Sequence, residues 1–191
     1  SATLEIVSGG TIGDTNASSP DVAVSQLTLV GAVAPGTSPG ILSVAGDFVF
    51  ANDDTFQVEI GGATPGTNNT NHDQLAATGS VTIGNNVTLS VSSWTGFVPT
   101  VLESYTIIER TGGAGTFAGL PEGATLTNFL GSGRNATITY AGGDGDDVVL
   151  TQVICVTNTN DSGPGALRQA ICSANASPVT DDICFNIPGS G

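Results

Sequence analysis

Apolar and polar residues alternate over short stretches through most of this chain. Such stretches occupy residues 4–7, 22–30, 41–44 and 48–50, and turns rich in glycine, proline and asparagine separate them. Alternation with a period of two is typical of strands that bury one face. The segment 34–40 interrupts the ladder, because proline donates no backbone hydrogen bond and glycine accepts a positive φ. The pattern predicts an all-β body.

One stretch near the C-terminal end has the spacing of a helix instead. Residues 165–175 carry apolar side chains that would form one buried stripe: Leu167, Ala170, Ile171 and Ala174. Strand-like segments precede this stretch at 154–156 and follow it at 183–187, which favours a crossover between two parallel strands. We therefore expect two parts, a β body over residues 1–151 and a strand–helix–strand segment over 152–191.

The composition limits the classes of molecule that this protein can bind. The 191 residues include no lysine and only three arginines against seventeen carboxylates, for a net charge of −14. A surface of this charge repels phosphate backbones and anionic lipid, so we expect neither nucleic-acid binding nor membrane insertion. No apolar run approaches the roughly 20 residues that span a bilayer. The sequence starts without a charged-then-apolar leader, and we expect that any secretion signal was removed or lies upstream.

Two passages resemble known families of secreted protein. The text APGTSPGILSVAGDFVF from Ala34, followed by TFQVEIGG from Thr55 and the acidic run at 142–147, is similar to autotransporter and filamentous-haemagglutinin-like surface proteins. The resemblance covers about residues 30–151. It implies a right-handed β-helix, or a β-solenoid that ends in a small sandwich-like cap.

The second resemblance begins where the first ends. Residues 153–191, with the text VTNTNDSGPGALRQAI from Val156, are similar to the N-terminal cap of secreted parallel β-helix proteins. In those proteins many further strands follow the cap, whereas here only 189–191 follow. The resemblance therefore implies that the segment caps something else, either the body of its own chain or a neighbouring subunit.

All three cysteines lie in this C-terminal segment. Cys155 and Cys184 alternate with apolar neighbours and would share a face on adjacent parallel strands, so we favour a disulfide between them. Cys172 is the alternative partner for either one. The third cysteine is then either a free thiol or forms a disulfide with another chain. A metal site is disfavoured because a fourth ligand is missing. The low aromatic content, the absence of methionine and the clustering of the three cysteines favour a secreted, extracellular or cell-surface protein.

The acidic run at 142–147 is the one candidate for a cation site. It looks like half of a calcium-binding repeat, whose ligands would be Asp144, Asp146 and Asp147. Only one copy is present, and calcium takes six or more oxygens, so the pattern favours an acidic hairpin turn without a cofactor.

The other polar candidates give no catalytic group. His72, the only histidine, lies in a polar turn without a partner nucleophile and is expected to be solvated. The acid pairs are also expected to be solvated turn carboxylates rather than a glycosidase dyad. These pairs are Asp53–Asp54, Asp146–Asp147 and Asp181–Asp182. The sequence therefore predicts no enzyme activity.

The leading hypothesis is a structural subunit of an extracellular fibre, sheath or adhesin stalk. Copies would assemble head-to-tail by strand addition through the C-terminal segment. Side chains on the two ends would carry the contact: Leu4, Ile6, Ile183, Phe185 and Ile187. The alternatives are an adhesin fragment that binds a glycan or receptor through loops, and a non-catalytic part of a carbohydrate-active β-helix protein.

Overall fold

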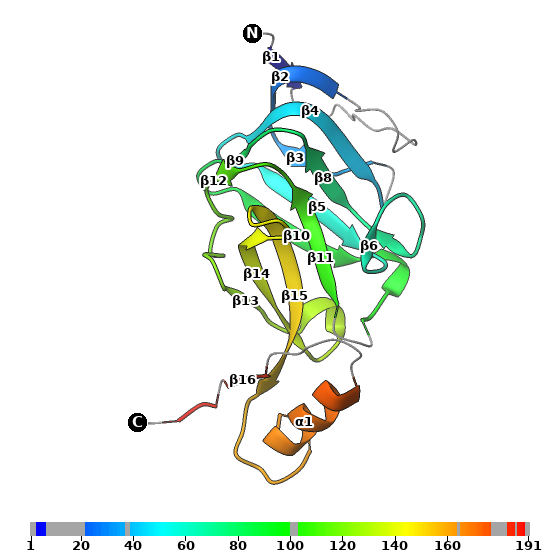
Figure 1. Ribbon diagram of the computed structural model, residues 1–191, viewed down its shortest axis with the longest axis vertical. Helices are drawn as coiled ribbons and strands as arrows, with labels where there is room; N and C mark the ends of the chain where they lie inside the picture. Colours follow the sequence, from blue (N-terminus) through cyan, green and yellow to red (C-terminus); the bar gives the residue numbers. More distant parts are fainter. Residues whose placement is uncertain are drawn as a thin grey trace.

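The chain is mostly β-strand with one short α-helix (Figure 1). The computed structural model describes residues 3–6, 22–36, 39–99, 103–163, 165–176, 183–185 and 187–189, and for 3–6, 22–24 and 176 it describes the backbone alone. The predicted all-β class with a single C-terminal helix is confirmed at this level. No helix among these residues is long and apolar enough to cross a membrane.

The described strands form a larger and a smaller sheet. The larger sheet has eleven strands, and its main path runs in the order β1 (Thr3–Ile6), β2 (Val22–Leu29), β4 (Ile41–Phe50), β8 (Gln74–Ala77), β11 (Ser104–Glu109), β15 (Asp147–Val156), β14 (Asn135–Gly142) and β13 (Thr125–Leu126). Three short strands pair beside this path: β9 (Val81–Ile83), β12 (Gly113–Ala114) and β16 (Ile183–Phe185).

The smaller sheet has five strands. These are β10 (Thr88–Ser93), β5 (Thr55–Ile60), β7 (Asn71–His72), β6 (Thr64–Pro65) and β3 (Ala32–Val33). Two 3-10 turns, η1 (Trp94–Gly96) and η2 (Phe129–Gly131), and the helix α1 (Leu167–Ala176) complete the elements.

Strands far apart in the sequence pair in parallel at a constant offset. In the larger sheet Ile41 of β4 lies opposite Gln74 of β8, and in the smaller sheet Thr55 of β5 lies opposite Thr88 of β10. The same 33-residue separation joins the hydroxyls of Thr55 and Thr88 at the starts of β5 and β10, and the backbone N–H of Asn85 to the side chain of Asn52 in the preceding turns. Residues 40–60 and 73–93 therefore form two adjacent layers that repeat the same path.

The parallel order does not continue through the body. β15 is antiparallel to both of its neighbours β11 and β14, β13 is antiparallel to β14, and β5 is antiparallel to β7. The larger sheet is consequently mixed, and it curls around the core (Figure 1). The β-solenoid that the resemblance implied for residues 30–151 is wrong, because the chain reverses direction at the β14–β15 turn and adds an antiparallel hairpin to the parallel strands.

Four phenylalanines form one cluster in the core of the body. Buried side chains alternate along β4, and the ring of Phe50 lies 4.7 Å from that of Phe48, 5.2 Å from Phe56 and 6.3 Å from Phe117, centroid to centroid. These rings are less than 2% exposed. Phe48 and Phe50 come from the larger sheet and Phe56 from the smaller, so the cluster ties the two sheets together.

The C-terminal segment has a second, smaller core. β15 continues beyond the body, and its last three residues pair in parallel with β16. α1 connects these two strands and covers them with Ala170, which packs with Ile154, Val156 and Ile183. The predicted single stripe on the helix is wrong in part, because Leu167 and Ile171 are exposed while Ala170 is buried and Ala174 half-buried. Figure 1 shows this segment at the opposite end of the molecule from β1.

We expect Phe50→Ala to destabilise the body by about 3–5 kcal/mol, because it leaves a cavity among the three neighbouring rings. Chemical denaturation followed by circular dichroism measures this change. Ser92→Ala, at an exposed position on β10, is the matched control and should change the free energy of unfolding by less than about 0.5 kcal/mol. An equal effect of the two substitutions would show that the rings do not form the core.

Candidate functional site

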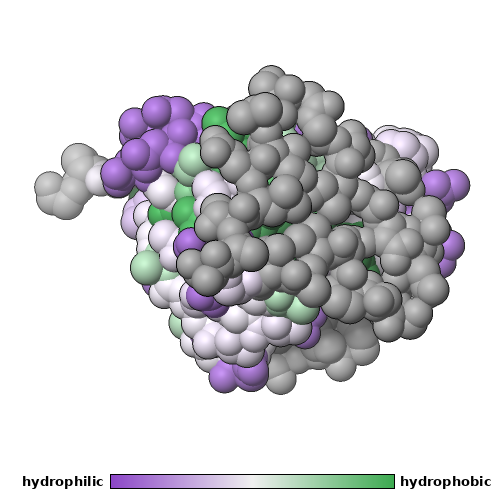
Figure 2. Space-filling model, turned by 90° about the horizontal axis from the view of Figure 1, so that it is seen from above, coloured by the Kyte–Doolittle hydropathy of each residue, from purple (hydrophilic) through white to green (hydrophobic). Residues whose placement is uncertain are grey.

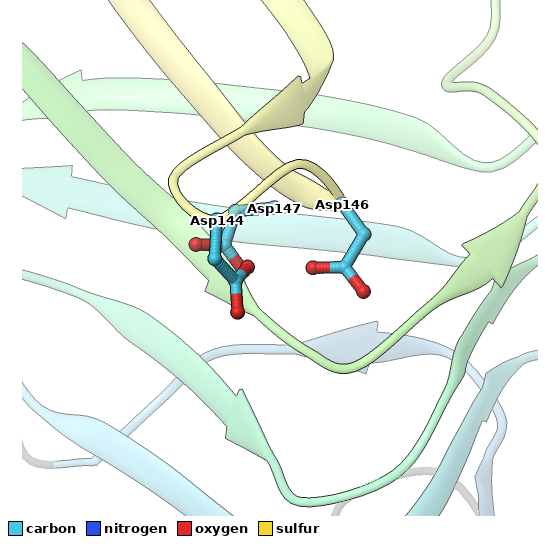
Figure 3. Close-up of side chains that lie close together, drawn as sticks. All are labelled: Asp144, Asp146 and Asp147. Carbon is cyan, nitrogen blue, oxygen red and sulfur yellow. The ribbon is translucent and has the colours of Figure 1, made fainter.

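The three candidate cation ligands lie together at the turn between β14 and β15 (Figure 3). One oxygen from each of Asp144, Asp146 and Asp147 lies within 4.8 Å of the others. Asp144 is exposed and Asp146 half-buried, whereas Asp147 is buried at the start of β15. Burial raises the pKa of the Asp147 carboxyl, and the charge of Asp144 adds to this.

A buried arginine already lies against this turn. The guanidinium of Arg110 donates from Nε to the backbone oxygen of Asp146, from Nη1 to that of Val81 at 3.0 Å and from Nη2 to that of Tyr140 at 3.3 Å. The backbone N–H of Arg110 donates to Asp147 Oδ1 at 3.0 Å. The turn gathers one oxygen from each of three carboxylates, whereas calcium takes six to eight oxygens. The geometry supports a structural clamp between β9 and the β14–β15 hairpin.

Burial lowers the pKa of the Arg110 guanidinium, while the neighbouring carboxylates Asp146 and Asp147 act in the opposite direction. The sequence-based hypotheses assign no role to Arg110. Its position is nevertheless a clue to a structural role, because this arginine directly follows an alternating apolar strand in a chain without lysine.

The prediction of a solvated His72 is wrong. The imidazole is fully buried, with Nδ1 2.9 Å from the carbonyl oxygen of Gly62 and Nε2 3.2 Å from that of Thr106. Burial lowers the pKa of His72. The ring joins the loop after β5 to β11, and both nitrogens lie against backbone carbonyl oxygens inside the fold.

The prediction of solvated acid pairs is wrong for Asp54, which is buried. Its carboxylate accepts hydrogen bonds from the backbone N–H groups of Gly31 and Ala51, both at 2.7 Å. Its neighbour Asp53 is exposed and has a positive φ of 66°. Asp147 is likewise buried, and the pair Asp181–Asp182 lies outside the described residues.

Asp73 makes a similar contact one layer further on. This buried carboxylate accepts from the N–H of Gly40 at 2.6 Å and from the N–H of Glu59 at 2.8 Å. Burial raises its pKa from 3.8 to about 6, against the effect of these two hydrogen bonds. Asp54 and Asp73 satisfy turn N–H groups that the strand ladders leave without a partner.

A polar repeat with the 33-residue spacing runs along the same turns. Asn52 Oδ1 accepts from the N–H of Asn85 at 2.8 Å, and Asp47 Oδ1 accepts from the N–H of Ser80 at 2.8 Å. Asn86 has a left-handed φ of 57°, and Asp53, at the equivalent position of the layer before, has a similar φ of 66°. A search for internal repeats would have found this spacing in the sequence.

The structure contains a disulfide between Cys155 and Cys184, the pairing that the sequence favoured. Both cysteines lie at paired positions on β15 and β16. The disulfide closes a loop that contains α1, while Cys172 on that helix is free and exposed.

An apolar groove lies beside this disulfide-linked unit. It has a volume of about 620 Å³ between α1, the loop after β15, and the residues in and after β16. Its exposed apolar side chains are Leu167 (43% exposed), Ile171 (45%), Phe185 (65%) and Ile187 (40%). Among the described residues only two other large apolar side chains, Val30 and Val98, are as exposed, so this groove is where exposed apolar surface gathers.

The predicted assembly residues thus lie at both ends of the molecule. Phe185 and Ile187 line the groove, whereas Ile183 is half-buried against the small core under α1. Leu4 and Ile6 lie on β1, where the structure describes the backbone alone.

No family model, no curated protein and no solved structure matches this chain. The two resemblances, to autotransporter-like surface proteins and to the cap of secreted β-helix proteins, are therefore unsupported, and the mixed sheet contradicts the fold implied by the first.

We expect Arg110→Lys to destabilise the protein by about 2–3 kcal/mol, because one ammonium group cannot reach the three carbonyl oxygens that the guanidinium fork binds. Denaturant unfolding measures the loss. Arg168→Lys, at an exposed arginine, is the control and should change stability by less than about 0.5 kcal/mol. Wild-type stability of the Arg110 variant would contradict the clamp.

Asp73 should make stability fall as the pH rises from about 4 to about 6. Because its pKa is raised on folding, the folded chain binds this proton more readily than the unfolded chain, so the contribution is present below pH 4 and lost through pH 6. In Asp73→Asn this part of the pH dependence should disappear from denaturation curves recorded at each pH. The exposed Asp53→Asn is the control and should retain it. An unchanged pH dependence in Asp73→Asn would refute the assignment.

Proposed function

We propose that this protein is a structural subunit of an extracellular fibre or sheath, in which copies join head-to-tail by strand addition at the C-terminal segment. The observation that carries the proposal is the apolar groove at one end of the molecule, combined with a strand at each end that has no second strand partner among the described residues.

Each outermost strand pairs on one side only within the described residues. Within the described residues, β1 pairs only with β2, and β16 pairs only with β15. An open edge of this kind is a template for a further strand, and soluble proteins cover it or use it. Because the two edges differ and lie at opposite ends, a contact between them is heterologous, and it generates a filament if its rotation does not close a ring.

Figure 2 looks down on the N-terminal end of the molecule, where a few hydrophobic side chains show among mainly neutral ones and hydrophilic side chains lie at the edge of the view. A contact that covers such hydrophobic side chains would gain their burial from water.

The disulfide supports an extracellular setting, where such bonds persist. β16 is only three residues long, and the disulfide to β15 fixes it at the end of the molecule. The carboxylates and the histidine that resembled catalytic candidates hold turns and layers together, which supports a structural role rather than an enzymatic one.

We expect the purified full chain to form linear assemblies as its concentration increases, visible by electron microscopy and light scattering. Mild reduction should disperse them, because opening the disulfide removes about 3–4 kcal/mol from a 29-residue loop and releases β16. The circular dichroism of the body should persist. Cys172→Ser should assemble and respond to reduction like the wild type. A full chain that stays monomeric at high concentration would refute the proposal.

A further inference from the structure

The helix α1 presents its larger apolar side chains to solvent. Ala166, just before it, and Ala170 are buried towards β15 and β16, whereas Leu167 and Ile171 are exposed. Leu167 and Ile171 are four residues apart and so lie on one face, one turn from each other. A helix that serves only to cover two strands would bury its leucine and isoleucine first, since these gain most from leaving water.

The exposed apolar face of α1 lines the groove together with side chains that follow the helix in the sequence. Phe185 at the end of β16 and Ile187 after it line the same groove as Leu167 and Ile171. The floor is Val156 at the end of β15. The groove therefore follows the outer side of the β15–β16 pair, next to the edge of β16 that has no strand partner in the described structure.

Charge limits what can occupy this groove. Arg168, on its rim, is the exposed arginine of the chain, since Arg110 is buried and Arg134 half-buried. Its guanidinium donates twice to the exposed Asp161, from Nη2 to Oδ1 at 2.9 Å and from Nε to the backbone oxygen at 3.1 Å. An exposed pair of this kind contributes little to stability and leaves the cation available to an acidic partner. The occupant is expected to be apolar on one face and acidic overall.

The N-terminal strand of a second copy has this chemistry. β1 alternates Leu4 and Ile6 with Thr3 and Glu5, which places two apolar side chains on one face of an extended strand. Residues 1–24 carry three carboxylates and no basic side chain. A molecule cannot fill the groove with its own β1, because β1 and α1 lie at opposite ends of the long axis (Figure 1).

We propose that the groove between α1 and β16 is the receptor for strand β1 of a second copy, with Leu4 and Ile6 packed against Leu167, Ile171 and Phe185. The backbone of the incoming strand pairs with the free edge of β16. Arg168 on the rim favours the acidic N-terminal segment over other apolar peptides. This assignment rests on the proposed head-to-tail assembly and adds the identity of the two surfaces.

The free thiol of Cys172 provides a native reporter of this contact. It is exposed on α1, one turn after Arg168 on the same side of the helix. A cysteine placed at Thr3 or Glu5 should therefore become linked to Cys172 of another copy by a short bismaleimide, and only under conditions where the chain assembles. Ser92→Cys, exposed on the body, is the control and should give no such link.

Mass spectrometry of the linked peptides identifies the partner. A link between the introduced cysteine and Cys172 supports the proposal, and the additional change Cys172→Ser should abolish it. Fibres that form without any link from either introduced cysteine to Cys172 would overturn the assignment and leave the fibre function standing. If neither fibres nor links appear at any concentration, both proposals fail together.

A second variant pair tests the groove without cysteine chemistry. Ile171→Ser should raise the concentration needed for assembly about tenfold or more, because it removes the burial of one large apolar side chain from the contact. Val98→Ser, at a similarly exposed apolar residue far from the groove in sequence, should assemble like the wild type. Equal effects of the two substitutions, or none from Ile171→Ser, would overturn the proposal. Both positions are exposed, so the monomer should keep its fold.

Discussion

The structure depends on satisfying backbone groups where successive layers of strands turn. Strand ladders pair the N–H and C=O groups of the straight segments, but at the turns those groups point at no ladder partner. Here buried carboxylates accept them, Asp54 from Gly31 and Ala51 and Asp73 from Gly40 and Glu59. Without these acceptors the layers would leave unpaired buried N–H groups, each of which costs about 1–3 kcal/mol.

The same constraint accounts for three further buried polar side chains. His72, Arg110 and Asp147 are buried because each bonds backbone groups from a different element. Arg110 is the clearest case, since its planar fork is the side chain best suited to reach several carbonyl oxygens at once. These buried polar side chains add contacts between the parallel strands of the body and the antiparallel β14–β15 hairpin.

Within the described residues, strand pairing stops at the two ends of the molecule, at β1 and at β16. β15 serves both parts of the chain, since its first residues pair with β11 and β14 and its last three pair with β16. Beyond β16 no further described strand follows, and the exposed face of α1 meets none of the core. Copies of a protein with an acidic, lysine-free surface repel one another. An attractive contact between them therefore requires a local apolar groove with a positive charge beside it.

The sequence by itself determined the strand-rich class and the single helix and favoured one cysteine pair, because alternation, helical spacing and matched strand positions are local patterns. The sense of pairing was decided only by the tertiary structure. Short alternating strands can pair in parallel or antiparallel order, and only the folded chain shows that β15 lies antiparallel to both β11 and β14. Burial of Asp54, His72 and Arg110 also escaped the sequence, since a polar residue in a turn is solvated or buried according to whether another layer covers it. The exposure of Leu167 and Ile171 followed from the same fact, because only the packed structure shows which side of a helix faces the strands.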